Sequence, residues 1–304
     1  MKEWARLFKA APFILYSKDE KMNLRKNRTF AFAIITLAYV VAVVTGIACY
    51  HYLPFAFWVN LLLADIAATI VIFIFSVAFH NASFYDAYWS VQPIVILLAF
   101  ACKHSLSGAA IFPFIATMVW GIRLTGNWAY TFKDLNWQDW RYTMLKEKTG
   151  KAYPIINFVG IHLVPTLVVY GCILPAVFTF VYGGNINVGC VLFFALSLGA
   201  TALQGTADFQ MHRFRKSGKG GFIRDGLWKY SRHPNYLGEI LMWWGIGLAA
   251  VCVMPDRWYL LAGALANTLL FTFVSLPLAE QRQSRKEGFA QYKQETRILL
   301  PIKK

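Results

Sequence analysis

Long apolar runs recur along this chain of 304 residues and are separated by shorter polar segments. An apolar stretch of about 20 residues can cross the hydrocarbon core of a bilayer as a helix, which satisfies every backbone polar group internally. We assign eight runs, at residues 30–50, 54–79, 91–102, 108–123, 154–182, 187–207, 237–254 and 259–279. The third run lies near the lower length limit. The sequence therefore predicts an all-α polytopic membrane helix bundle with about eight (7–8) transmembrane helices.

Composition supports this class. Hydrophobic residues make up 58% of the chain and charged residues 15%, with a mean hydropathy of +0.46, whereas a soluble domain carries about 25% charged residues. The close spacing of the runs predicts one transmembrane domain over residues 29–304. Residues 1–28 place Trp4 and Phe8 against Lys2 and Arg6. We expect them to form a basic amphipathic interfacial segment and not a cleavable signal.

The positive charge is unevenly distributed. The net charge is +15, and 27 of the 30 Lys and Arg residues lie in segments 1–28, 126–153, 208–236 and 281–304. Clusters beside membrane spans are the pattern expected for cytoplasmic loops, so we expect no nucleic-acid partner. Eight crossings place both termini on one side, which predicts a multi-pass protein with both termini in the cytoplasm.

Metal and nucleophile motifs are not evident in the sequence. The five cysteines form no Cys-x-x-Cys pair and lie in or at the ends of apolar runs, so we expect free thiols. His51, His80 and His104 are scattered without metal-ligand spacing, and we interpret His162 as a core histidine. We therefore expect no metal site.

One polar stretch between two apolar runs reads Gly226-Leu-Trp-Lys-Tyr-Ser-Arg-His-Pro-Asn-Tyr-Leu-Gly-Glu239. Pro234 suits the first turn of a helix, with Ser231 or Asn235 as its cap. Such a helix start offers unpaired N–H groups and a positive dipole end, which bind anions. The alternative is a positive-inside anchor with snorkelling side chains, but an anchor needs no His, Asn or Glu.

This stretch, followed by Trp243-Trp244-Gly245, resembles the C-terminal signature of the steroid 5-alpha-reductase-like membrane proteins, and most closely their bacterial branch of unknown function. Other matching pieces are Ser83-Phe-Tyr-Asp-Ala-Tyr-Trp-Ser90, Trp120-Gly-Ile-Arg-Leu-Thr-Gly-Asn-Trp128 and Asp139-Trp-Arg-Tyr142. The resemblance runs from about Trp58 to the C-terminus. It implies an oxidoreductase of lipid metabolism in a bacterial inner membrane. The wider superfamily also includes isoprenylcysteine carboxyl methyltransferases.

The resemblance implies NADPH as cofactor, with S-adenosylmethionine as the alternative. It places at cofactor-contacting positions, or directly beside them, Arg123, Asn127, Asp208, Arg215, His233, Asn235, Tyr236, Glu239 and Glu280. Arg215, Arg224 and Arg232 suit a pyrophosphate and a 2′-phosphate, because a guanidinium binds phosphate bidentately.

Structural alternatives stay open for several of these residues. Arg215 and Lys216 are equally typical of a solvated positive-inside pair. Arg123 has Asp65 or Glu280 as candidate ion-pair partners. Glu280 in turn has Arg232 or Arg282.

Reduction of a C=C bond beside a carbonyl requires a hydride donor, an acid at the carbonyl oxygen and a dry apolar slot. Tyr85 and Tyr88 precede the third run as candidate acids, with Asp86 to orient one of them. An interfacial aromatic belt is the alternative. The steroid enzymes' own proton donors are absent, since Trp120 and Val91 replace a Tyr and a Glu.

The sequence therefore predicts NADPH-dependent reduction of a lipophilic substrate that is steroid-, enone- or isoprenoid-like, in contact with membrane lipids. Two alternatives remain: an S-adenosylmethionine-dependent methyltransferase and a non-enzymatic lipid-binding protein. The oligomeric state is not predicted. Asp65, a lone acid in the second run, is expected to bond Asn60 or Thr69 or to face water.

Overall fold

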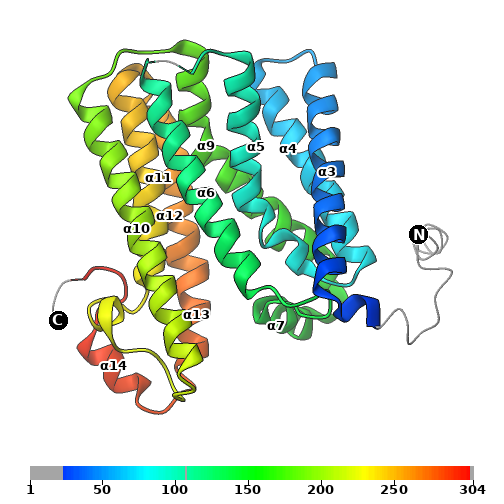
Figure 1. Cartoon of the computed structure of the whole chain (residues 1–304), viewed down its shortest axis with the longest axis vertical. Coiled ribbons are helices and arrows are strands. Elements are labelled where there is room, and N and C mark those ends of the chain that lie inside the picture. The colour runs from blue at the N-terminus through cyan, green and yellow to red at the C-terminus, as the bar shows by residue number, and fades with distance from the viewer. Residues whose placement is uncertain (1–22, 107, 302–304) are drawn as a thin grey trace. The chain divides into compact units, whose positions relative to one another are not determined.

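The computed structural model describes residues 23–106 and 108–301 (Figure 1). The predicted interfacial segment falls mostly on residues 1–22, outside the described residues. Within the described part, eight helical stretches are long and apolar enough to cross a membrane: Arg28–Tyr52, Phe57–Ala78, Ala82–Lys103, Gly108–Thr131, Trp140–Tyr182, Val188–Lys216, Pro234–Val253 and Pro255–Gln283. The prediction of an all-α, multi-pass membrane protein is confirmed. Their large exposed apolar side chains face lipid.

The chain divides into two compact units, of which unit 1 comprises residues up to 92 together with 124–167. Its long helices α3 (Arg28–Tyr52) and α4 (Phe57–Ala78) pack against each other (Figure 1). Ala31, Ile35, Ala38 and Ala42 recur every three or four residues on α3 and are buried. Small side chains on one helix face allow two helices to pack closely. In a bilayer this packing matters because the hydrophobic effect does not drive helices together.

The remaining elements of unit 1 are shorter. They are η1 (Ala82–Tyr85), the start of α5 (Tyr88–Lys103), the end of α6 (Ile111–Thr131), α7 (Trp140–Thr149), η3 (Gly150–Ala152), α8 (Tyr153–Ile156), the π-helical η4 (Asn157–Leu163) and the start of α9 (Val164–Tyr182).

Unit 2 comprises residues 93–123 and 168 onward. Beyond the other parts of α5, α6 and α9, it contains η2 (Gly108–Ala110), α10 (Val188–Lys216), η5 (Gly226–Lys229), α11 (Pro234–Val253), η6 (Pro255–Leu261), α12 (Ala262–Leu270), η7 (Phe271–Ser275), α13 (Leu276–Gln283) and α14 (Phe289–Glu295).

Helices α10 and α11 pack against each other along their length in unit 2 (Figure 1). A Cβ added to Gly238 would lie 2.7 Å from the carbonyl oxygen of Ala200, and one added to Gly245 would lie 2.8 Å from that of Phe193. The two glycines are seven residues apart on one face of α11, so they let the two backbones touch.

Two segments predicted to be loops are largely helical. In the segment 126–153, α6 continues to Thr131 and α7 covers Trp140–Thr149. The loop predicted to begin at Asp208 begins after Lys216, because α10 has 29 residues. At 1.5 Å per residue such a helix is about 43 Å long and outruns a hydrocarbon core of about 30 Å. Hydropathy marks where a helix leaves the bilayer, whereas backbone hydrogen bonds and basic residues in its last turn decide where it stops.

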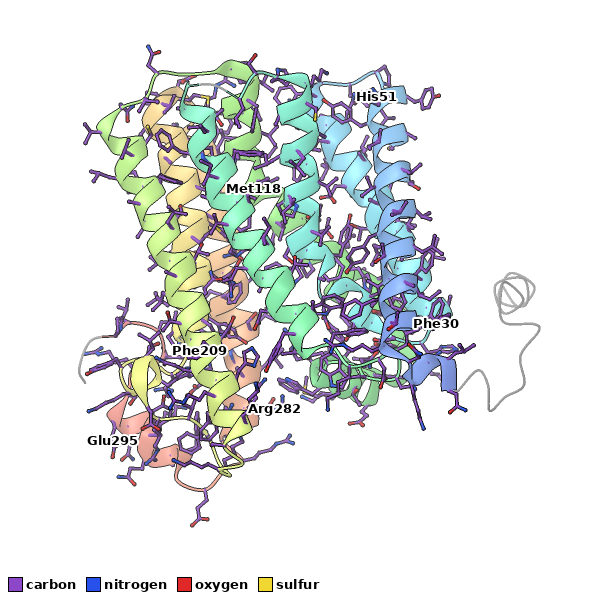
Figure 2. The ribbon with its side chains drawn as sticks, in the orientation of Figure 1. Phe30, His51, Met118, Phe209, Arg282 and Glu295 are labelled. Atoms are coloured by element: carbon purple, nitrogen blue, oxygen red, sulfur yellow. The ribbon has the colours of Figure 1, made fainter. Side chains whose placement is uncertain are left out.

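Basic segments gather at one end of each unit. In unit 1, Arg25 donates hydrogen bonds to the carbonyls of Phe79 and Leu135 and to Asn136. In unit 2, Phe209, Arg282 and Glu295 lie together at one end of that unit (Figure 2). Each unit thus brings together segments that the charge pattern had assigned to one side of the membrane.

Candidate cofactor site

The polar stretch 226–239 begins with the short helix η5 and continues into α11, which starts at Pro234. The predicted caps are wrong: His233 occupies the N-cap position, and no side chain caps the helix. The Ser231 hydroxyl instead accepts the backbone N–H of His233 at 3.3 Å. Because the residue before a proline is excluded from helical dihedrals, His233 lies outside the helix, with φ −139° and ψ 61°.

Arg232 clamps the start of α11 to the end of α13. Its Nε lies 3.0 Å from Oε1 of Glu280 and its Nη2 lies 2.8 Å from Oε2, a bidentate pair. Its Nη1 donates to the carbonyls of Lys293 and Thr296 in the C-terminal segment. The side chains of Arg232 and Glu280 are 5% and 12% exposed. Of the two ion-pair partners that the sequence left open for Glu280, this structure has Arg232.

His233 and Tyr236 continue this clamp. Nε2 of His233 lies 2.8 Å from Oε1 of Glu280, and its ring stacks on Tyr236 at 5.3 Å between centroids. Tyr236 meets the edge of Phe271 at 5.0 Å. Beside them, Oδ1 of Asn235 is buried without a hydrogen-bond partner among the described residues. This acceptor remains available for a polar ligand.

One turn further along α11, the buried carboxylate of Glu239 is held by two indoles. Its Oε2 accepts from Nε1 of Trp120 at 2.9 Å and its Oε1 from Nε1 of Trp243 at 2.8 Å. The two indole rings meet nearly edge to face, with centroids 4.8 Å apart. Sequence reasoning gave Trp243 no role, although its position four residues after Glu239 places both on one helix face. Trp120, at the position where the resemblance expects a tyrosine in the steroid enzymes, therefore donates a hydrogen bond to a carboxylate here.

Arg123 pairs with Asp208, and this partner was not among the alternatives predicted for it. Its Nη1 lies 2.8 Å from Oδ2 of Asp208, and its Nη2 donates to Oε1 of Gln204. Nε of Arg123 is buried without a hydrogen-bond partner among the described residues. Arg123 also interacts electrostatically with Glu239. The cluster of Trp120, Arg123, Gln204, Asp208, Glu239 and Trp243, called below the α11 cluster, joins α6, α10 and α11 within unit 2.

The other predicted cofactor residues are not part of this cluster. Arg224 donates to the carbonyl of Gly288 at 2.9 Å, and its guanidinium lies 5.0 Å from the ring centre of Phe222. Arg215 lies in the last turn of α10. Asn127 belongs to unit 1, and all the other predicted cofactor residues belong to unit 2.

The predicted proton donors all lie in unit 1 but bond different partners from those expected. Asp86 accepts from the hydroxyl of Tyr142 at 2.6 Å, and Tyr85 shares a hydrogen bond of 2.9 Å with Thr166. Tyr88 donates to Oδ1 of Asp65 at 3.2 Å. The acid that faces a candidate donor is thus Asp65 and not Asp86.

Asp65 and His162 are buried polar groups of the same unit. Gln92 Nε2 donates to Oδ2 of Asp65, so the partners of Asp65 are Tyr88 and Gln92 where Asn60 or Thr69 had been expected. His162 is fully buried, with Nδ1 2.9 Å from the carbonyl of Asn157 and its ring 5.0 Å from that of Tyr85. Its Nε2 lacks a hydrogen-bond partner among the described residues.

Comparison with known proteins identifies the family. The family model described as "Protein of unknown function (DUF1295)" matches residues 72–296, so the chain belongs to this family, which is related to the steroid 5-alpha-reductases. Similarity extends to 3-oxo-5-alpha-steroid 4-dehydrogenase 1 of Macaca fascicularis, 30% identical over 111 residues, or 36% of this chain. An uncharacterized protein of Schizosaccharomyces pombe is 26% identical over 226 residues, or 64% of this chain. The chain spans 39% and 65% of the lengths of these relatives. No solved structure matches.

Proposed function

We propose that this member of the DUF1295 family is an integral membrane oxidoreductase that uses NADPH to reduce a C=C bond conjugated to a carbonyl. Its substrate is lipophilic, of the steroid, enone or isoprenoid class, and reaches the protein from the bilayer. The protein lies in a bacterial inner membrane with both termini in the cytoplasm, where the basic ends of its helices face the nucleotide pool. The observation that carries the proposal is the α11 cluster. Within membrane-spanning helices it combines the buried carboxylate of Glu239, the largely shielded pair of Arg123 and Asp208, and polar atoms that have no hydrogen-bond partner among the described residues.

The residues of unit 2 fit a dinucleotide. A buried polar atom without a partner costs free energy unless a ligand or water satisfies it. Counting only partners in the described part of the chain, Nε of Arg123 is such a donor and Oδ1 of Asn235 is such an acceptor. Both residues occupy positions that the family resemblance assigns to cofactor contacts. The similarity to the steroid dehydrogenase of Macaca fascicularis supports the same cofactor.

The bound nicotinamide would supply the hydride, and side chains of this protein would hold the cofactor. Arg123 supplies positive charge, kept in place by Asp208 and Gln204. Glu239 is held immobile by Trp120 and Trp243, whose side chains are almost fully buried and exclude water from this part of the unit. Electrostatic interactions are stronger where water is excluded. Arg232 and Glu280 position His233 and Tyr236.

The candidate proton donors are the tyrosines predicted from the sequence. Tyr88 is buried, and its hydroxyl is bonded to the carboxyl group of Asp65, which gives the phenol an acid partner within the membrane. Tyr85, bonded to Thr166, is the second candidate. Asp86 acts indirectly, since its bond to Tyr142 fixes the segment that carries both tyrosines. This assignment retains the predicted donors and adds Asp65 behind one of them.

A thermal-shift experiment on the purified full chain in detergent tests the cofactor. NADPH is expected to raise the melting temperature, and S-adenosylhomocysteine is not, because a ligand that binds only the folded state stabilises it. Asn235→Ala should reduce the NADPH effect, whereas Gln291→Ala, which removes an exposed contact to Glu295, should not. Stabilisation by S-adenosylhomocysteine alone would indicate a methyltransferase, and stabilisation by neither would favour a lipid-binding protein.

A further inference from the structure

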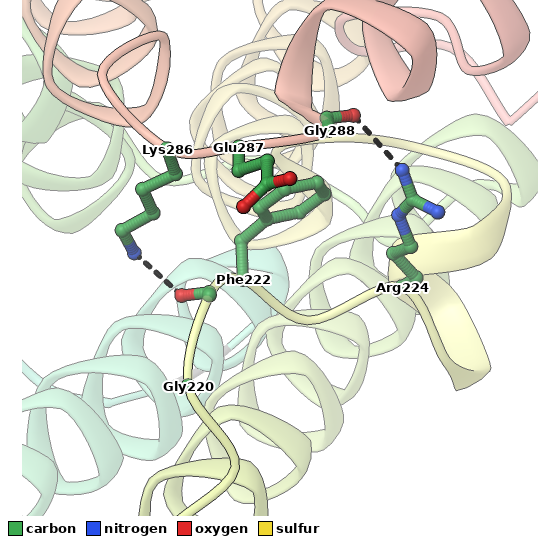
Figure 3. Close-up of a pocket in the computed structure, with 7 residues that line it drawn as sticks. Gly220, Phe222, Arg224, Lys286, Glu287 and Gly288 are labelled. Carbon is green, nitrogen blue, oxygen red and sulfur yellow. Dashed lines mark hydrogen bonds between the residues drawn. The ribbon is translucent and has the colours of Figure 1, made fainter.

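Unit 2 contains an open pocket of about 520 Å³ outside the membrane-spanning helices. One wall is the segment that follows α10, with Gly220, Gly221, Phe222 and Arg224. The other wall is Lys286, Glu287 and Gly288, which follow α13 (Figure 3). Two hydrogen bonds tie the walls together, from Lys286 Nζ to the carbonyl of Gly221 at 2.8 Å and from Arg224 to that of Gly288. The pocket is therefore a built feature of the fold.

The pocket is positively charged. Among its described lining residues, Arg224 and Lys286 are cations and Glu287 is an acid. The pKa of Lys286 is lowered, first by burial and then by the positive charges of Arg282 and Arg215. The two neighbouring guanidinium groups, and not the burial, are what favour an added anion beside Lys286. The ammonium group has three donors, of which Gly221 takes one, so two remain for a ligand.

Helix α10 connects this pocket to the α11 cluster. Gln204, Asp208 and Arg215 recur at intervals of four and seven residues, which places them on one face of the helix. Gln204 and Asp208 bind Arg123 at one end, and Arg215 lies within electrostatic range of Lys286 at the other. The rise from residue 204 to 215 is about 16 Å, a separation that an extended dinucleotide can span.

We propose that this pocket receives the adenosine 2′-phosphate of NADPH and thereby distinguishes NADPH from NADH. The inference rests on the proposed function and names the subsite that sets its cofactor specificity. Lys286 and Arg224 contact the phosphate, and the stacked pair of Phe222 and Arg224 forms a flat wall for the purine.

Glu287 is the feature that makes the assignment testable. An acid in a nucleotide pocket accepts hydrogen bonds from the ribose hydroxyls of NADH and repels a 2′-phosphate. Glu287 makes no ion pair within 4.0 Å with Lys286 or Arg224 and is exposed, so it can turn outward. The cations, together with Arg215 and Arg282, outnumber it, and the charge balance favours the phosphate.

The experiment measures dissociation constants of NADPH, NADH, 2′,5′-ADP and 5′-AMP for the full chain in nanodiscs of a neutral lipid. The native protein should bind NADPH and 2′,5′-ADP more tightly than NADH and 5′-AMP. Lys286→Gln should weaken the binding of NADPH and 2′,5′-ADP by about tenfold or more, because one charge-assisted hydrogen bond is lost. The affinity for NADH should not change. Glu287→Gln should strengthen the binding of NADPH and 2′,5′-ADP, because it removes a negative charge from the pocket. Lys286→Arg should retain most of the affinity, and Lys229→Gln, a matched loss of charge outside the lining residues, should change nothing.

Each contrary result has a distinct meaning. Equal affinities for NADPH and NADH that Lys286→Gln leaves unchanged would overturn the subsite while the proposed function stands. Tighter NADH binding that Glu287→Gln weakens would make the pocket a ribose-diol site and also overturn it. A Lys286-dependent rise in melting temperature on adding phosphatidic acid, without 2′,5′-ADP binding, would assign the pocket to a lipid headgroup. Failure to bind either dinucleotide would refute the proposed function itself.

Discussion

Arg123 on α6 and Asp208 on α10 form an ion pair with 2.8 Å between Nη1 and Oδ2, although 85 residues separate them in the chain. The side chains are 20% and 19% exposed, so the pair is largely shielded from water. Arg123 also binds Gln204, four residues before Asp208 on α10. The pair therefore fixes the end of α6 in unit 2 against one face of α10.

Breaking this pair from one side should cost more than removing it entirely. Asp208→Asn leaves the charge of Arg123 without its counterion, and we expect a loss of about 1–3 kcal/mol of stability. Adding Arg123→Gln should recover part of that loss, measured as the coupling energy of a double-mutant cycle by thermal unfolding in detergent. Additive effects of the two substitutions would show that the pair contributes no coupling.

The indole N–H of Trp243 should contribute more to the stability of the protein than the indole N–H of Trp244. Trp243→Phe leaves the buried Glu239 carboxylate with one indole donor fewer, a loss of about 1.5–3 kcal/mol for a bond to a charged group. Trp244→Phe is the matched control, because Trp244 donates to the neutral hydroxyl of Thr268 at 2.9 Å, a bond worth about 0.5–1.5 kcal/mol. Equal losses of stability would mean that Glu239 is not stabilised as a charge.

The glycines of α11 should not tolerate a methyl group. Gly238→Ala places a Cβ 2.7 Å from the backbone oxygen of Ala200, which forces α10 and α11 apart at a cost of about 1–3 kcal/mol. At Gly199 on α10 a Cβ meets nothing within 4 Å, so Gly199→Ala should raise stability by up to about 1 kcal/mol through helix propensity. Comparing the two melting temperatures tests the packing, and a stable Gly238→Ala protein would contradict it.

Tyr88→Phe should slow turnover without weakening NADPH binding, if Tyr88 is the proton donor. Removing a general acid typically costs a factor of about 100 or more in rate. Asp65→Asn should slow the same step and change the pH dependence of turnover, an effect that loss of packing alone does not produce. Tyr39→Phe is the control, since Tyr39 donates to the backbone carbonyl of Phe84 in the same unit. Full activity of Tyr88→Phe would transfer the role to Tyr85.

The sequence predicted the membrane spans well because hydropathy and helix length are local properties. It placed the seventh span at residues 237–254, and the structure has Pro234–Val253. It missed where α10 ends and where α7 forms, because both lie outside the apolar runs, where hydropathy carries no signal.

The sequence by itself determined the fold class and the clustering of positive charge, since both follow from residue types at short spacing. Tertiary structure decided the partners: Asp208 for Arg123, Trp120 and Trp243 for Glu239, Asp65 for Tyr88 and Glu280 for Arg232. Each of these contacts joins residues more than 20 positions apart in the chain. The exception is the bond from Trp243 to Glu239, which lies within one helix. The reason is physical: a buried charge can be matched by any opposite charge or donor that packing brings within about 3 Å, and only the packed helices determine which one it is.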